Sequence, residues 1–146
     1  MKKRLSVFVC LMLAMVMTAG AVFAGVQSGN SDVGRGNFDK TYTGTNSKFV
    51  AYGKSSEAYV TLENLATTSR YLSCYVFEIT DNIGLTNSNS ASMTASQGVQ
   101  ISTTIPRDLN MYGYYQYSGT CKYSEYGGGT IDEYTYKAYQ RRTIGE

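Results

Sequence analysis

Residues 70–80, RYLSCYVFEIT, carry apolar or aromatic side chains at seven of their eleven positions. Alternate residues of a β-strand point to opposite sides, so Leu72, Cys74 and Val76 share one face. The opposite face receives mostly aromatic and branched residues, namely Tyr71, Tyr75, Phe77 and Ile79. A strand that is apolar on both faces is typical of the middle of a sheet, and we predict a central strand here.

The segments around this strand have the same two-residue period. Residues 57–65, EAYVTLENL, place Ala58, Val60 and Leu62 on one face against polar residues on the other, which predicts a half-buried strand. The run DNIGLTNSNS over 81–90 consists of turn formers and is predicted to be a loop.

Apolar residues alternate again in the second half of the chain. One set contains Ala91, Met93 and Ala95, and a second contains Val99, Ile101, Thr103 and Ile105. Gln97-Gly98 is predicted to be a turn or a bulge between these sets, and Pro106 to end the second strand. Strands are also predicted over 110–117 and 132–142, with YGGG (126–129) in their connection.

This pattern predicts an all-β fold. No segment after the N-terminal region keeps helical spacing over three turns, and about seven short strands alternate with turn signals. We therefore expect a small antiparallel β-sandwich of about seven strands, with a small barrel as the alternative.

The N-terminal segment predicts export. Residues 1–24, MKKRLSVFVCLMLAMVMTAGAVFA, combine a basic start, an apolar run and small residues at the end. This order is typical of a secretory signal peptide, with cleavage after Ala24 favoured over cleavage after Ala21. An uncleaved anchor is the alternative. Residues 25–37, GVQSGNSDVGRGN, are predicted to be a flexible leader, followed by a single domain over 38–146 of a secreted protein.

The charge balance excludes two classes of partner. Loss of the signal peptide removes three of the 13 basic residues and none of the 11 acidic ones, which leaves ten against eleven and a net charge of −1. Binding of nucleic acid needs clustered Lys and Arg, so no such partner is expected. A membrane would be contacted only through the uncleaved signal segment. The partner is otherwise unknown, and a cell-surface or cell-wall component is the candidate.

Two cysteines remain after removal of Cys10 with the signal peptide. Cys74 and Cys121 are predicted to form a disulfide, because an exported chain meets an oxidising environment. Two buried free thiols are the alternative.

The composition also excludes most catalytic chemistry. The chain has no histidine, no Cys-x-x-Cys pair and no phosphate-binding glycine loop, so no metal site or cofactor is predicted. The available carboxylates are sparse and are expected to be solvated surface groups. These are Glu57, Glu63, Glu78, Asp81, Asp132 and Glu133. We accordingly predict a protein without enzymatic activity.

Tyrosine is concentrated near the C-terminus. The run MYGYYQYSGTCKYSEY, residues 111–126, holds six of the 14 tyrosines, and about half of them are expected in the core. The candidate binding face is a cross-strand ladder of Tyr112, Tyr114, Tyr134 and Tyr136. Such a ladder could equally stabilise the sheet without binding anything.

The segments EAYVTLENLATTSR and NMYGYYQYSG resemble small secreted lactococcin-type bacteriocins and similar exported β-sandwich proteins of Gram-positive bacteria. The resemblance implies surface recognition on neighbouring cells. Two alternatives stay open: a glycan or cell-wall binding module that uses exposed tyrosines, and a self-associating extracellular structural protein.

Overall fold

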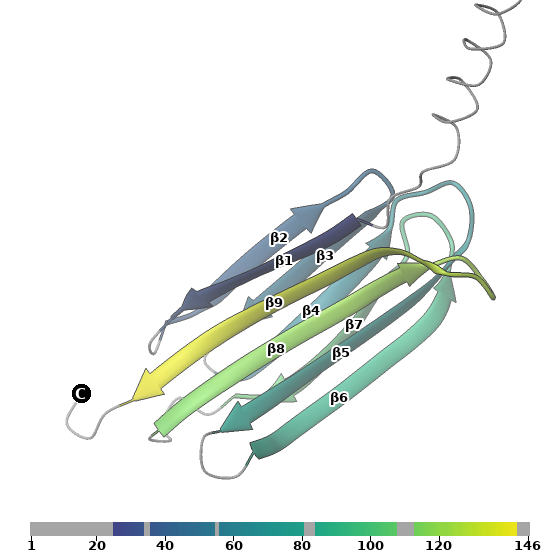
Figure 1. Ribbon diagram of the computed structural model, residues 1–146. Coiled ribbons are helices and arrows are strands. Elements are labelled where there is room, and N and C mark those ends of the chain that lie inside the picture. Colours follow the sequence, from purple (N-terminus) through teal and green to yellow (C-terminus); the bar gives the residue numbers. More distant parts are fainter. Residues whose placement is uncertain (1–24, 34–35, 55, 81–83, 108–112, 143–146) are drawn as a thin grey trace, which may run out of the picture.

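Two β-sheets face each other across one core (Figure 1). The computed structural model describes residues 25–142 except 34–35, 55, 81–83 and 108–112. The five-stranded sheet has the order β1 (Gly25–Asp32), β9 (Thr130–Arg142), β8 (Gly113–Ser124), β5 (Arg70–Thr80), β6 (Gly84–Ala95). The four-stranded sheet has the order β2 (Phe38–Thr43), β3 (Ser47–Gly53), β4 (Glu57–Asn64), β7 (Gln100–Pro106).

This arrangement confirms the predicted all-β sandwich and corrects the number of strands. The described residues form nine strands, not about seven. Neighbouring strands are antiparallel except β1 and β9, which run parallel.

Among the described residues, no helical segment has the length and apolar character needed to cross a membrane. The predicted signal peptide lies outside the described residues.

The N-terminal leader is a strand over most of its length, so that prediction is wrong. Gly25–Asp32 pairs with β9 from Asp132 to Tyr139. No side chain of this strand belongs to the buried core, which explains why the apolar pattern gave no signal. Main-chain hydrogen bonds to β9, together with a hydrogen bond between Ser31 Oγ and the Tyr136 hydroxyl, hold this polar strand at the edge of the sheet.

The loop predicted over 81–90 is also shorter than expected. β6 begins at Gly84 and pairs with β5 as far as Ala95, with a register shift where Ile79 faces Leu85. Most β6 side chains are exposed, so serine and asparagine are tolerated. Residues 81–83 lie outside the described part of the chain.

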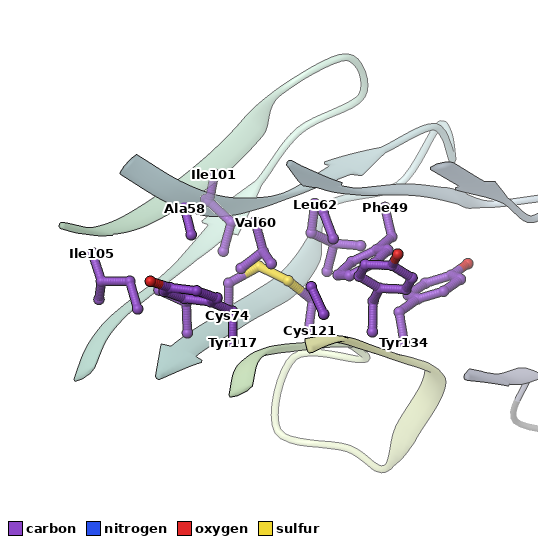
Figure 2. Packing of buried hydrophobic residues seen from close by; sticks show 14 of the residues in the cluster. Phe49, Ala58, Val60, Leu62, Cys74, Ile101, Ile105, Tyr117, Cys121 and Tyr134 are labelled. Atoms are coloured by element: carbon purple, nitrogen blue, oxygen red, sulfur yellow. A yellow bond between two sulfur atoms is a disulfide. The ribbon is translucent and has the colours of Figure 1, made fainter. Parts of the chain in front are cut away.

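The core consists of the faces that the two-residue period assigns to the interior (Figure 2). Leu62, Leu72 and Phe49 are fully buried. The predicted turn at Gln97-Gly98 and the end of β7 at Pro106 are both confirmed. In the C-terminal tyrosine run, Tyr115, Tyr117 and Tyr123 are buried, whereas Tyr126 is exposed.

The disulfide between Cys74 and Cys121 is present and buried. β8 continues to Ser124, so Cys121 lies inside the strand directly opposite Cys74 of β5. Figure 2 shows the bridge in the interior, close to Val60 and Leu62. The bond is therefore part of the core, and it fits an oxidising environment.

Buried tyrosines make the fold sensitive to alkali. Burial raises the pKa of Tyr117, Tyr123 and Tyr134 above the ordinary value. The glutamate at position 78 raises the pKa of Tyr117 further, while the Arg107 guanidinium lowers it.

We expect the free energy of unfolding to fall above about pH 10. The unfolded chain loses phenolic protons near that pH and the folded chain retains them, so this stability is full below about pH 10 and is lost as pH rises toward the folded pKa values. Each buried tyrosine contributes a slope of up to about 1.4 kcal/mol per pH unit. Urea denaturation from pH 8 to 11 measures it, and Tyr134→Phe should reduce the slope. A flat profile would contradict the expectation.

Candidate functional site

The structure does not form the predicted tyrosine ladder. Tyr134 and Tyr136 are 1% and 5% exposed, so neither can present a ring to a ligand. Tyr134 faces Cys121 and Tyr136 faces Gly119 across β8 and β9. Gly119 leaves room on the same inner face for Val60 of the opposite sheet, since a Cβ at position 119 would clash with the Val60 side chain.

Contacts across the core hold the two buried rings. The Tyr134 ring stacks on Phe49 at 5.5 Å between centroids, and its hydroxyl shares a 2.7 Å hydrogen bond with Ser47 Oγ. The Tyr136 ring lies 5.9 Å from that of Phe38. Both residues therefore stabilise the interior, and their assignment to a binding face was wrong.

The other two residues of the predicted ladder are Tyr112 and Tyr114. Tyr112 is outside the described residues. Tyr114 faces Arg141 along β8 and β9, at a position of opposite parity to the buried Tyr115 and Tyr117.

A different aromatic surface lies on the outer face of the five-stranded sheet. Tyr71 and Tyr75 of β5 are 38% and 39% exposed, and Tyr126 in the turn after β8 is 81% exposed. Two adjoining shallow hollows of about 270 and 430 Å³ share Tyr71, Ser73 and Lys122. We call this surface the tyrosine groove, formed by Tyr71, Ser73, Tyr75, Ser90, Ser92, Thr120, Lys122, Ser124 and Tyr126.

Strand register explains why these rings are accessible. Tyr75 lies between Ser90 of β6 and Thr120 of β8, and both neighbours are small. Tyr71 lies in the same way between Thr94 and Ser124. The neighbouring strands thus leave part of each ring open to solvent, while along β5 itself the Tyr75 ring contacts that of Phe77 at 5.3 Å between centroids.

Tyr71 and Tyr75 lie along one strand and share the outer face of the sheet. They stand four residues apart on one face of β5, which is about 13 Å at the ordinary rise of a strand. Ser73 lies between them, flanked by Ser92 and Lys122. The groove therefore alternates aromatic and hydroxyl surface along the strand.

Few charged side chains line the tyrosine groove. Lys122 Nζ lies 3.8 Å from Glu133 Oε2, and both side chains are at least a third exposed. An exposed pair of this kind contributes only about 0–1 kcal/mol, so Lys122 can turn toward a ligand at low cost. Glu125 lines the hollow beside Tyr126.

The carboxylates do not all follow the prediction. Glu78 is 5% exposed, and it accepts hydrogen bonds from Thr86 Oγ1 and from Asn87 Nδ2, the latter at 3.1 Å. It is thus a buried structural residue, not a solvated one. Asp132 is half-buried and accepts a 2.8 Å hydrogen bond from Ser47. Asp81 lies outside the described residues. Within the described segments, no three Asp, Glu, Cys or His side chains cluster as metal ligands would.

The sequence pattern places Tyr71 and Tyr75 on one face of a central strand but does not assign that face to the protein surface. The signal was available in their parity, because they alternate with Leu72, Cys74 and Val76. In a two-layer sandwich, only one face of a strand meets the other sheet. Once the cysteine face is placed inside, the tyrosine face has to lie outside.

Comparisons with known proteins do not identify a family. No family model matches the chain, and no curated protein matches it. A Bacteroides fragilis protein assigned as a beta-galactosidase is 18% identical, with 74% of this chain and 17% of that chain covered and a TM-score of 0.39.

Two other solved structures are equally distant. A glycosyl hydrolase family 2 member from Bacteroides cellulosilyticus is 12% identical, with 74% and 15% of the two chains covered and a TM-score of 0.38. A PapD-like domain of human CEP192 is 10% identical, with 84% of each chain covered and a TM-score of 0.39. The chain thus spans less than a fifth of either bacterial protein, and at these scores the similarity says nothing about its ligand.

Proposed function

We propose that the protein is an exported binding module without enzymatic activity, and that the tyrosine groove binds an extended glycan of the cell wall or cell surface. Two exposed tyrosines on one face of β5, each opposite small residues of the two neighbouring strands, are the observation that carries this proposal. Sugar rings have apolar faces that pack on aromatic rings, while their hydroxyl groups bond to polar side chains. The groove offers both kinds of surface in alternation.

Export is part of the same proposal. It rests on the predicted signal peptide and on the disulfide, which persists best in an oxidising compartment. The antibacterial action implied by the resemblance to lactococcin-type bacteriocins gains no support from the fold or the comparisons, and we do not develop it.

We expect Tyr71→Ala and Tyr75→Ala each to weaken glycan binding about tenfold, since a packed aromatic ring contributes on the order of 1 kcal/mol beyond its buried area. Purified peptidoglycan and neutral cell-wall polysaccharides serve as probes in pull-down and calorimetric titration. Tyr71→Phe should retain most of the affinity, because it keeps the ring.

Tyr52→Ala is the matched control. Tyr52 is a half-buried tyrosine on the outer face of the four-stranded sheet, where its ring lies 5.2 Å from that of Tyr59. This variant should bind like the wild type. Equal retention of the wild type and both groove variants would rule out the groove as the binding site.

A further inference from the structure

β6 is a long sheet edge on which one main-chain donor is already bonded, since the Ser90 N–H donates to Asn89 Oδ1 at 2.9 Å. It lies at the margin of the five-stranded sheet, with β5 on one side (Figure 1). Its twelve residues, GLTNSNSASMTA, include no charged residue and no proline. Edge strands carry unpaired N–H and C=O groups, and proteins usually prevent further pairing there with charges, proline or a short strand.

The edges of the four-stranded sheet, β2 and β7, show those protections. β2 is only six residues long and carries Asp39 and Lys40. β7 is seven residues long and ends at Pro106, and the Thr104 carbonyl accepts a 3.0 Å hydrogen bond from Asn89 Nδ2 of β6. β1 has eight residues and ends at Asp32. β6 is thus the longest edge strand and has neither charge nor proline.

We propose that β6 pairs antiparallel with β6 of a second copy of this chain, which joins two five-stranded sheets into one. The pairing of β6 with β5 skips Thr86, because Glu78 pairs with Asn87 and the next residue, Ile79, pairs with Leu85. The part of β6 that pairs without interruption is therefore 87–95. A twofold axis near Ala91 aligns this part with itself and places Ser88 of one copy opposite Thr94 of the other. An uncharged strand meets no like charge in this pairing.

The pairing would also bring together the tyrosine grooves of the two copies. Ser90 and Ser92 line the tyrosine groove at its β6 side. The grooves of the two copies would therefore lie on one continuous sheet face. The pairing itself does not depend on glycan binding, and it is tested without any ligand.

Sedimentation equilibrium of the exported chain should show a reversible monomer–dimer equilibrium without larger species, because a twofold pairing uses up the open edge. The variant Ser88→Lys/Thr94→Lys should dimerise at least tenfold more weakly, and so should Ser88→Glu/Thr94→Glu. An equimolar mixture of the two variants should restore a heterodimer, because each Lys then faces a Glu.

Lysines at Thr41 and Thr43 on β2 form the matched control, since both positions are exposed on another edge. This control should dimerise like the wild type. A wild type that is monomeric at its highest soluble concentration would overturn the proposal. So would larger oligomers, undiminished dimerisation of the charged β6 variants, or a mixture of variants that stays monomeric.

Discussion

Replacement of both Cys74 and Cys121 by alanine should lower the free energy of unfolding by about 3–5 kcal/mol. The bond joins two neighbouring strands, but it closes a loop with a sequence separation of 47 residues. That loop includes β6 and β7, and β7 belongs to the opposite sheet. The bridge therefore restricts the unfolded chain across both layers, which is where most of its stabilisation arises in the chain-entropy description.

Urea denaturation of the oxidised wild type, the reduced wild type and the double variant measures this effect. The two proteins without the bridge should unfold at similar, lower urea concentrations. Loss of less than about 1 kcal/mol would contradict the expectation, because it would mean that the unfolded chain is already constrained without the bond.

The interior of the sandwich could be predicted because its strands have a regular side-chain period. Ala58, Val60 and Leu62 of β4, and Leu72, Cys74 and Val76 of β5, are all buried as expected. The period fixes which residues share a face but not which face turns inward. For β9 this choice was wrong, because Tyr134 and Tyr136 lie on its inner face, where their rings contact Phe49 and Phe38 of the other sheet.

Two parts of the five-stranded sheet's edges could not be predicted from side chains, namely β1 and the first half of β6. β1 has no residue in the core, and in β6 only Ala95 is buried there. Their position is determined by main-chain hydrogen bonds to β9 and β5, to which any residue except proline can contribute. A strand held in this way looks like a polar loop in the sequence.

The tyrosine groove could not be predicted from the sequence for a related reason. Tyr71 and Tyr75 contribute to the apolar character that predicts a central strand. β5 does have neighbours on both sides, β8 and β6, but only one of its faces is covered by the other sheet. Aromatic residues on the uncovered face are therefore available for binding.

One buried residue connects several loops at one end of the sandwich. Arg107 follows β7 directly and is 3% exposed. Its guanidinium donates hydrogen bonds to the carbonyls of Lys54 (2.8 Å) and Gly36 (2.6 Å), and to Gln140 Oε1 (3.3 Å). These acceptors lie in three separate parts of the chain: the β3–β4 connection, the segment before β2, and β9.

Aromatic rings enclose the same guanidinium. Its central carbon lies 5.4 Å from the centre of the Phe38 ring and 5.6 Å from that of Tyr117. Both contacts are close enough for cation–π attraction, which is stronger in a desolvated site. Arg107 thus links the four-stranded sheet to β8 and β9 through packing and hydrogen bonds together.

Arg107→Ala should lower the free energy of unfolding by about 3–5 kcal/mol, because it leaves buried acceptors without donors and opens a cavity beside two rings. Arg107→Lys should recover only part of this loss, since an ammonium group cannot reproduce the planar geometry that reaches separate carbonyls at once. Urea denaturation of the three proteins gives the comparison. If the lysine variant were as stable as the wild type, charge alone would be sufficient, and the planar donor arrangement would not be what joins this end of the two sheets.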